Sequence, residues 1–161
     1  MSGEGVFDAS SAINCINSDS LELVLSIPDL ALGVGPIVRR ECGHAALEAA
    51  IVSGSLRVLD DSSFPAGRFL ALLRRYRLGD GETECLLFGE AHQLIVITDD
   101  AAARRAVEDL LGITMLTGSL GLLHRAVVAA LIDAAEAMTR YERMKAAGGF
   151  LPEIDVEFFA K

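Results

Sequence analysis

The sequence lacks several features that define whole classes of protein. No uninterrupted apolar run approaches the roughly 18–20 residues that cross a bilayer as a helix. The opening residues, MSGEGVFDAS, contain neither a basic segment nor the apolar core of a signal peptide. We therefore expect a cytoplasmic protein that has no membrane partner.

Cysteine is scarce, and its number is odd. The three cysteines are widely spaced, and each lies among apolar neighbours: Cys15, Cys42 and Cys85. This pattern suits reduced, buried thiols better than a disulfide framework. The stretch ECGH (41–44) brings Glu, Cys and His together, but no second group of ligands accompanies it. A zinc site is therefore not expected.

Motifs of several phosphate-handling proteins are also missing. The glycines of GVG (33–35) are not followed by the Lys-Ser/Thr pair of a P-loop. A haloacid-dehalogenase-type phosphatase needs D-x-D after its first strand, whereas this sequence has DAS at 8–10. A receiver domain needs an acid pair at the first strand and a lysine at the fifth, and the sequence offers neither. We expect none of these three classes.

Lysine is nearly missing from a chain that is acidic overall. The net charge is −9, and 12 of the 14 basic residues are arginine. The negative charge argues against a general nucleic-acid coat protein, whose basic surface normally dominates. Arginine suits phosphate because its planar guanidinium donates two parallel hydrogen bonds. Unless they only form solvated helix surfaces, the candidates for phosphate contacts are Arg39, Arg40, Arg104 and Arg105; Arg74, Arg75 and Arg77 form a further cluster.

The apolar content of the chain is high. Hydrophobic residues make up 52% of the 161 residues, and the mean hydropathy is +0.40. This length suits one domain with a substantial core. We therefore expect a single domain over residues 1–161, with the helices and tail of residues 119–161 packed on it.

Short apolar runs alternate with stretches of helical spacing. The expected strands are residues 5–10, 30–35, 56–60, 94–98 and 113–118. The expected helices are residues 11–26, 37–53, 64–77, 82–92 and 100–111, with two more in 119–147. Such an alternation pairs strands in parallel through right-handed crossovers, and continuous apolar strands are covered on both faces. The fold class we predict is α/β, a three-layer α/β/α sandwich with a parallel central sheet.

Local signals indicate where two of these helices begin or end. Gly112 follows the apolar pair at 110–111 and suits a helix C-cap. Asp80 is suited to cap a helix that begins near Gly81, with Glu82 favourable in its first turn. These signals support helices on both sides of the expected strand at 94–98.

Acidic residues follow the expected strands, where ligands bind in an open parallel sheet. Asp8 ends the first strand, and Asp99 and Asp100 end the fourth. Glu41 lies in the first turns of the helix after the second strand, and Glu84 lies near the start of the helix before the fourth. We expect these side chains, which come from four separate segments, to gather at one end of the sheet.

Glu84 has an unusual position for an acid. On a helix it shares its face with Leu87, Phe88 and Ala91. A carboxylate on an apolar face is costly unless it is paired, protonated or bound to a cation. Glu82, two positions earlier, points elsewhere and suits an ordinary acid of the first turn. Glu84 is therefore the stronger candidate for a site.

Each acid also has a simpler explanation. Asp100 could cap the helix at 101–111, Asp8 could cap the helix after the first strand, and Glu41 could pair with an arginine. A cluster of four carboxylates repels itself, however, and the hard cations Mg²⁺ and Mn²⁺ prefer carboxylate oxygens. Two such ions about 3.5–4 Å apart activate a water and stabilise the leaving oxygen in phosphodiester cleavage.

The order of these motifs resembles the PIN-domain superfamily, and in particular a prokaryotic branch related to VapC-type toxins. The resemblance spans essentially the whole chain and is strongest over residues 78–126. The stretches that carry it are VFDAS (6–10), PIVRREC (36–42), GETE (81–84), TDDAAARRA (98–106), TGSLGLLHRA (117–126) and the closing AAGGFLPEIDVEFFAK.

The resemblance implies an acidic pocket that binds Mg²⁺ or Mn²⁺, ribonuclease activity, a homodimer and an antitoxin partner that blocks the site. Asp8 and Glu41 match the family's first two acids, whereas Glu84 lies where most members have an aspartate. The family's T-x-D arrangement selects Asp100 as the fourth acid, and Asp99 is a neighbour that can contribute a ligand. The turn TGSLG departs from the more usual GTLG of this branch.

Two functions are consistent with these residues. The first is a metal-dependent endoribonuclease, the toxin of a type II toxin–antitoxin pair, with Asp8, Glu41, Glu84 and Asp100 as catalytic residues. The second is a non-catalytic PIN-like module that acts through protein contacts and retains a vestigial acidic pocket. Metal binding and RNA cleavage distinguish the two.

Overall fold

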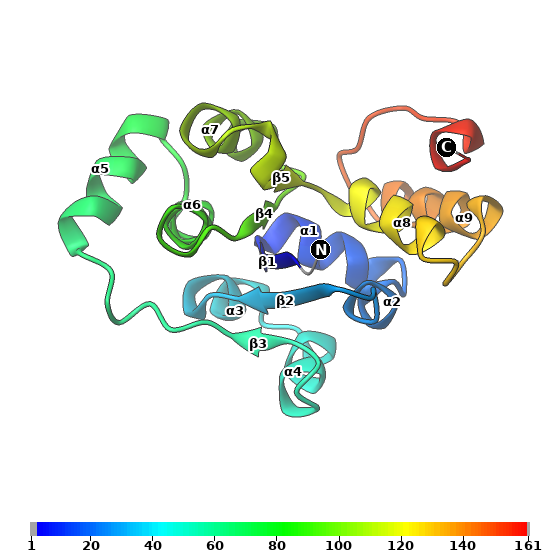
Figure 1. Ribbon diagram of the computed structural model, residues 1–161, viewed down its shortest axis with the longest axis horizontal. Coiled ribbons are helices and arrows are strands. Elements are labelled where there is room, and N and C mark those ends of the chain that lie inside the picture. The colour runs from blue at the N-terminus through cyan, green and yellow to red at the C-terminus, as the bar shows by residue number, and fades with distance from the viewer. Residues whose placement is uncertain (1–2, 161) are drawn as a thin grey trace.

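A parallel sheet forms the centre of the computed structural model, which describes residues 3–160 (Figure 1). Its strands lie in the order β3-β2-β1-β4-β5, and all neighbours pair in parallel. The strands are β1 (Gly3–Phe7), β2 (Leu30–Val34), β3 (Arg57–Val58), β4 (Ile95–Ile97) and β5 (Leu116–Thr117). The predicted parallel sheet is confirmed.

Strand β1 lies in the middle of the sheet, between β2 and β4. Phe7 is opposite Val34 on one side and Ile97 on the other, so the three strands end at the same level. The chain leaves β1 toward β2 and later continues from β4 toward β5 in the opposite direction. The boundary between β1 and β4 is therefore the topological switch point, where open α/β sheets bind ligands beyond the carboxyl ends of their strands.

Helices cover both faces of this sheet, so the predicted three-layer α/β/α sandwich is confirmed. They are α1 (Ala9–Asn17), α2 (Leu21–Leu25), α3 (Pro36–Cys42), α4 (Ala45–Val52), α5 (Ala66–Tyr76), α6 (Asp80–His92), α7 (Ala101–Leu111), α8 (Ser119–Val128) and α9 (Ala134–Ala146), with short 3-10 helices η1 (Ile113–Met115) and η2 (Val156–Phe159). Figure 1 shows α1, α2, α8 and α9 on one side of the sheet and α5, α6 and α7 on the other. Within residues 3–160, no helix is long and apolar enough to span a membrane.

Two apolar clusters form the core. The larger cluster surrounds the sheet, and fully buried Phe7 and Val96 belong to it. The smaller cluster joins α8, α9 and η2 around the buried ring of Tyr141. Leu23 and Ile132 pack against both clusters. The helices and tail after residue 118 therefore share apolar contacts with the rest of the molecule.

Two of the expected long helices are divided. The expected helix 11–26 is interrupted at Asp19, whose φ of 55° is left-handed, and the chain resumes as α2. The expected helix 37–53 ends at Gly43, a left-handed C-cap with φ of 52°, and restarts at His44, whose ring accepts a hydrogen bond as the N-cap of α4. Local capping overrides the continuous apolar spacing in both places.

Two further boundaries differ from expectation. Only the end of the expected strand 113–118 is a strand, because a 3-10 helix occupies Ile113–Met115. The N-cap of α6 is Gly79 rather than Asp80, which lies in the first turn and interacts there with the helix dipole. Gly112 is the C-cap of α7, as predicted.

Candidate active site

Asp8 connects the central strand β1 to α1. The sequence favours a strand to residue 10, whereas β1 ends at Phe7 because Asp8 turns the chain into the helix. Its carboxylate accepts a hydrogen bond from the backbone N–H of Ser11 at 2.9 Å and one from Ser10 Oγ at 2.8 Å. Thr98 Oγ1, which follows β4, donates to the other oxygen. Asp8 is therefore the N-cap of α1, as its simpler explanation predicted.

Burial destabilises the ionised form of Asp8. The side chain is 2% exposed, and burial raises its pKa from 3.8 to about 6. Hydrogen bonds from Ser11, Thr98 and Ser10 lower this pKa, and the neighbouring carboxylate of Asp99 raises it further. A cation placed beside Asp8 would favour the ionised form and relieve the cost of burial.

Asp99 holds three elements together. Its carboxylate accepts hydrogen bonds from Asn14 Nδ2 of α1 at 2.8 Å and from the backbone N–H of Ser119, at the start of α8, at 2.9 Å. The hydroxyl of Ser119 donates to it as well. Asp99 is half-buried and near enough to raise the pKa of Asp8 by its charge. The two aspartates are therefore neighbours at the switch point.

Asp100 has a different environment from Asp99. It is exposed, and its Oδ1 accepts a hydrogen bond from the backbone N–H of Ala103 at 2.8 Å. This contact makes Asp100 the N-cap of α7, as its simpler explanation predicted. Asp100 thus caps the start of a helix, while the charge of Asp99 acts on Asp8.

Glu41 lies at the end of α3 against the start of α6. It is exposed, and the backbone N–H of Gly81 donates to its carboxylate. A Cβ on residue 81 would meet this carboxylate, so the glycine leaves room for the observed position of Glu41. Partial desolvation and the charges of Glu82 and Asp80 raise the pKa of Glu41, and the charge of Arg40 lowers it. Glu41 therefore belongs to an acidic group at the start of α6.

Glu84 is buried against the first turn of α3. It is 1% exposed, and its carboxylate accepts hydrogen bonds from the backbone N–H groups of Ile37 at 3.0 Å and Val38 at 3.2 Å. It occupies the space that a Cβ at Gly35 would fill. Burial raises the pKa of Glu84, and the two backbone hydrogen bonds lower it. The carboxylate on the apolar face is thus paired with a helix N-terminus.

The predicted acids gather at one edge, but they do not form a single cage. Asp8 lies near Asp99, and Glu41 lies near Glu82 and Asp80, because the charges within each group raise the pKa of Asp8 and of Glu41. Cys85 lies between the groups, because the charges of Asp8, Glu84, Glu82 and Glu41 all raise the pKa of its thiol. Within residues 3–160, no three His, Cys, Asp or Glu side chains are grouped so that they could hold a metal ion.

The predicted phosphate contacts differ in how available they are. Arg39 donates from Nε to Glu48 at 2.8 Å and from Nη2 at 2.6 Å, so its fork is already used. Arg104 donates to the backbone carbonyl of residue 98 at 2.9 Å. Arg40 and Arg105 form no ion pair with any described residue. Their guanidinium groups are therefore available to a ligand.

Several residues of the site were not predicted from the sequence. They are the hydrogen-bond donors to Asp8 and Asp99, together with the glycine that makes room for Glu41: Ser10, Asn14, Thr98, Ser119 and Gly81. Thr98 belongs to the T-x-D arrangement, and Ser119 belongs to the turn TGSLG, so both lie in motifs. Asn14 carries no comparable signal.

A parallel sheet with carboxylates beyond its central strands is typical of α/β proteins that bind ligands at the switch point. The family model for the PIN domain matches residues 5–157 of the chain. The chain therefore belongs to the PIN-domain family. PIN domains are generally nucleases, and they typically use divalent metals.

A solved structure supports the same fold. The chain is similar to the crystal structure of PAE2754 from Pyrobaculum aerophilum, with a TM-score of 0.57 and 17% sequence identity over 82% of this chain and 92% of that one. At this identity the likeness supports the fold alone. No curated protein matches the sequence significantly. The predicted relation to VapC-type toxins is compatible with these findings and stays a prediction.

Proposed function

We propose that this PIN domain is a Mg²⁺- or Mn²⁺-dependent endoribonuclease that cleaves single-stranded RNA. The observation that supports it most is the burial of Asp8 beyond the end of β1, with the carboxylate of Asp99, which follows β4, near enough for its charge to act on Asp8. No arginine or lysine within residues 3–160 forms an ion pair with Asp8. A buried carboxylate that has no ion-pair partner and has a second carboxylate nearby suits a bound metal ion.

The donor set fits a hard cation that keeps part of its water shell. Mg²⁺ retains several waters and needs only one or two protein carboxylates, in addition to phosphate oxygens of the substrate. Asp8 and Asp99 meet this need although no cluster of three ligands exists among residues 3–160. A bound ion of this kind supplies an activated water and neutralises charge on the reacting phosphate.

The surrounding side chains hold the two carboxylates in fixed directions. Hydroxyl and amide donors restrain them, and their contribution is to orient the carboxylate oxygens before a ligand binds. These donors are Ser10, Thr98, Asn14 and Ser119. Arg40 and Arg105 are the basic side chains we assign to the phosphates of the substrate.

The remaining predicted ligands receive separate roles in this proposal. Glu41 is exposed at the same edge and is the third acid that a second, water-bridged ion could use. The carboxylate whose charge raises the pKa of Asp8 is that of Asp99. Glu84 and Asp100 accept hydrogen bonds at the starts of α3 and α7, so we assign these two to the positioning of the helices. That Glu84 and Asp100 bind the metal stays a prediction, and the Mn²⁺ affinities of Glu84→Gln and Asp100→Asn test it.

We further propose that the protein is the toxin of a type II toxin–antitoxin pair, that it acts in the cytoplasm as a homodimer, and that an antitoxin blocks the acidic edge. This proposal rests on the motifs shared with VapC-type toxins. Co-purification with a neighbouring gene product and a mass of twice the 17.1 kDa chain are the expected observations.

Cleavage of single-stranded RNA tests the nuclease. Asp8→Asn is expected to abolish Mg²⁺- or Mn²⁺-dependent cleavage while the far-UV circular dichroism stays that of the wild type. The matched control is Asp29→Asn at the amino end of β2, where the exposed residue has a left-handed φ of 58° that asparagine tolerates. Equal cleavage by the Asp8 variant and the wild type contradicts the proposal.

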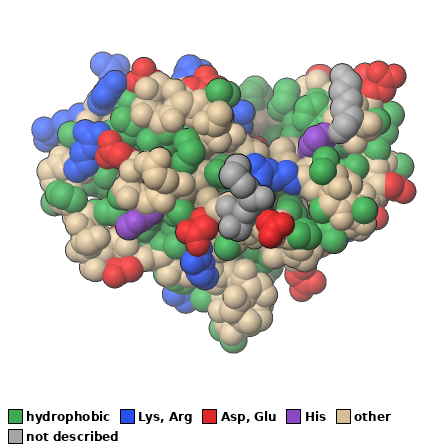
Figure 2. All heavy atoms as spheres, viewed as in Figure 1, with side chains coloured by type: hydrophobic (Ala, Val, Ile, Leu, Met, Phe, Trp, Pro, Cys, Tyr) green, Lys and Arg blue, Asp and Glu red, His purple; other side chains and the backbone are tan. Residues whose placement is uncertain are grey.

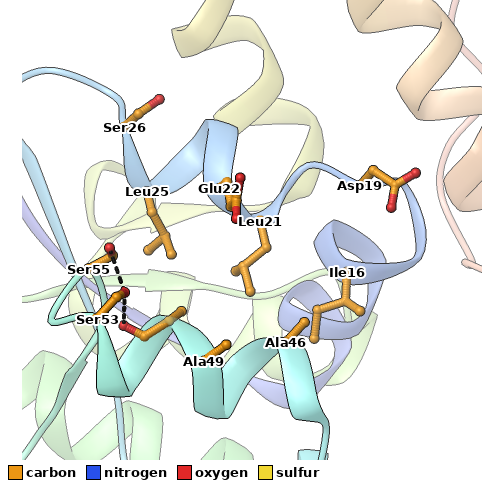
Figure 3. Close-up of a pocket in the computed structure, with 11 residues that line it drawn as sticks. Ile16, Asp19, Leu21, Glu22, Leu25, Ser26, Ala46, Ala49, Ser53 and Ser55 are labelled. Atoms are coloured by element: carbon orange, nitrogen blue, oxygen red, sulfur yellow. Dashed lines mark hydrogen bonds between the residues drawn. The ribbon is translucent and has the colours of Figure 1, made fainter.

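A groove between α2 and α4 favours the second candidate, a module that acts through protein contacts. Its volume is about 800 Å³. Leu21 of α2 points across it toward the part of α4 that carries Ala46 and Ala49, and Leu25 points toward the Ser53 end of that helix (Figure 3). The exposed Glu22 also lines it. Apolar walls with an acidic rim suit an amphipathic partner helix that carries basic residues.

Binding of a helical peptide with one apolar face and a lysine-rich face tests this second candidate. Ala49→Glu is expected to abolish binding, whereas Ala102→Glu, at an exposed position of α7, is expected to leave it unchanged. Peptide binding by a wild type that neither binds Mn²⁺ nor cleaves RNA supports the module. Failure of the wild type to bind the peptide contradicts it.

A further inference from the structure

A small apolar pocket lies beside the acidic edge, where α3, α5 and α6 meet. It encloses about 380 Å³, at the lower end of the range for small-molecule sites. Its walls are mainly aromatic and aliphatic, and its polar edge consists of carboxylates. The residues that matter here are Phe64, Phe69, Leu70 and Leu87 on the walls, with Asp61 and Glu84 at the edge.

The aromatic wall is held in place by further rings. The ring of Phe64 packs edge-on against Phe88 with centroids 4.7 Å apart, and it lies 5.9 Å from the ring of His92. Phe88 is fully buried, so this support is rigid. Leu70 is 46% exposed at the mouth of the pocket. A flat ligand would therefore meet preformed apolar surfaces and would cover an exposed leucine.

The polar edge offers acceptors without donors. Asp61 is half-buried, and its carboxylate accepts no hydrogen bond from any described residue. Glu84 uses its oxygens on the backbone N–H groups of Ile37 and Val38. The charge of Asp61 raises the pKa of Glu84, so the two carboxylates are near one another. A ligand that brings N–H donors would satisfy Asp61.

Helix α5, which forms one wall, is basic in an otherwise acidic protein. Residues 64–79 contain four arginines and no acidic residue, whereas the whole chain has a net charge of −9. Arg68 and Arg75 pair with Glu90 and Asp109. Arg74 and Arg77 form no ion pair within residues 3–160. Figure 2 shows Lys and Arg side chains gathered at the end of the molecule where α5 lies.

We propose that this pocket receives one base of single-stranded RNA, a base that carries an amino group, while Arg74 and Arg77 contact the neighbouring phosphates. The proposal deepens the proposed function and rests on RNA being the substrate. Unpaired bases stack on aromatic side chains and expose their Watson–Crick edge to hydrogen bonds. Asp61 accepts from the exocyclic amine of adenine, cytosine or guanine, whereas uracil has no such amine.

The position of the pocket links base recognition to the acidic edge. Helix α6 carries Glu84 at the pocket and Glu82 beside Glu41, less than one turn away. A base in the pocket therefore lies close to the group formed by Glu41, Glu82 and Asp80. In this proposal the pocket selects the nucleotide, and cleavage itself belongs to the Asp8–Asp99 centre of the proposed function.

Fluorescence anisotropy without metal tests the pocket in the wild-type chain. The probes are labelled oligo(A), oligo(C) and oligo(U) ribonucleotides in EDTA, and an oligo(A) with abasic positions. Oligo(A) and oligo(C) are expected to bind at least about fivefold more tightly than the abasic probe, because stacking contributes this much per base. They are also expected to bind more tightly than oligo(U), because uracil stacks but has no exocyclic amine for Asp61. Equal affinity for all four probes overturns the proposal. The comparison uses only the wild-type protein, so it does not depend on whether a variant folds.

Variants assign the effect to residues. Phe69→Leu keeps an apolar side chain and is expected to weaken oligo(A) binding at least about fivefold. Asp61→Asn is expected to reduce the preference for oligo(A) over oligo(U), whereas Glu142→Gln, exposed on α9, leaves it unchanged. The double variant Arg74→Gln/Arg77→Gln is expected to lower the salt slope by about 1.4, and Arg125→Gln of α8 is its control.

The outcomes separate this inference from the nuclease proposal. RNA binding that depends on Phe69 and Asp61, in a protein that never cleaves RNA, supports the pocket and removes the proposed activity. Metal-dependent cleavage with no effect of Phe69→Leu or Asp61→Asn on binding overturns the pocket and leaves the nuclease. Tighter binding of a peptide than of any RNA probe at this pocket also overturns the inference.

Discussion

At the scale of residues, the central feature is a carboxylate whose burial costs stability. Asp8 caps α1, yet its burial beside Asp99 raises its pKa to about 6. A cap alone does not require an acid with so little exposure, because an asparagine caps a helix equally well. The charge itself is therefore what distinguishes Asp8, and the cation of the proposed function would favour that charge.

The stability of the metal-free protein should report this cost. The pKa of Asp8 is about 6 in the folded chain and 3.8 for an unburied aspartate, as in the unfolded chain. The folded state therefore binds the proton more tightly than the unfolded state. Stability then falls as pH rises from about 4 to about 6, by up to about 3 kcal/mol. Asp8→Asn is expected to be more stable than the wild type at pH ~8 and similar at pH ~4, measured by urea unfolding in EDTA. If the variant and the wild type are equally stable at both pH values, burial of the Asp8 charge does not destabilise the protein and this account is contradicted.

The two adjacent aspartates should respond differently to substitution. Asp100→Asn keeps the cap of α7 and is expected to leave stability and Mn²⁺ affinity unchanged, whereas Asp100→Ala costs about 1 kcal/mol. Asp99→Asn is expected to weaken Mn²⁺ binding at least about tenfold, and Ser119→Ala about tenfold through loss of orientation. Isothermal titration with Mn²⁺ measures these affinities. Loss of affinity in Asp100→Asn instead would make Asp100 the ligand, as the T-x-D arrangement predicts.

Local signals explain why part of the site could be predicted from the sequence. Asp8 and Asp100 each precede a helix, so their caps follow from adjacent residues. The partners of Asp99 are distant in sequence: Asn14 is 85 positions away and Ser119 is 20. Such contacts depend on how α1 and α8 pack, and no spacing along the chain indicates them.

At the scale of elements, the first turn of α3 explains the unusual place of Glu84. The helix begins at Pro36 after Gly35, which has no side chain to cap it. Glu84 supplies the acceptor from α6 instead. The sequence indicated that this carboxylate needed a partner, but backbone N–H groups of another helix have no signature in side-chain spacing.

Substitution of Glu84 distinguishes capping from metal ligation. Glu84→Ala is expected to cost about 1–2 kcal/mol, because two backbone N–H groups lose their acceptor. Glu84→Gln retains one oxygen that can accept from both, so its cost is expected to stay below about 1 kcal/mol, with unchanged Mn²⁺ affinity. Urea unfolding and titration calorimetry measure the two effects. A Gln variant that is stable but no longer binds Mn²⁺ assigns Glu84 to the metal.

The elements themselves were largely predicted, and their breaks were not. Apolar runs between helical stretches correctly indicated the parallel strands, and for β1, β2 and β4 the reason is that mostly buried strands carry few polar residues. The breaks at Asp19 and Gly43 depend on single left-handed residues. Aspartate adopts that conformation only when the surrounding structure favours it, so residue type alone did not reveal the break.

At the scale of the whole molecule, the C-terminal helices form a second apolar cluster that shares members with the first. Contacts of α8 and α9 with α1, and of α8 with α2, join the two clusters, and Leu23 packs against both. This arrangement favours one cooperative unit. The single domain that the chain length predicts stays a prediction.

Tyrosine fluorescence can test this cooperativity, because the chain has two tyrosines and no tryptophan. Tyr76→Phe leaves Tyr141, in the smaller cluster, as the reporter of that region. Urea transitions followed by this fluorescence and by far-UV circular dichroism are expected to coincide. An earlier fluorescence transition would show that the C-terminal helices unfold separately, and would contradict a single domain.

A metal centre formed by Asp8 and Asp99 at the switch point has one direct test, which is the anomalous scattering of Mn²⁺ in a soaked crystal. We expect a peak within about 2.5 Å of a carboxylate oxygen of each aspartate, with waters completing the coordination. A peak held by Glu41 and Glu82 alone, or the absence of any peak at millimolar Mn²⁺, would contradict the proposed metal centre.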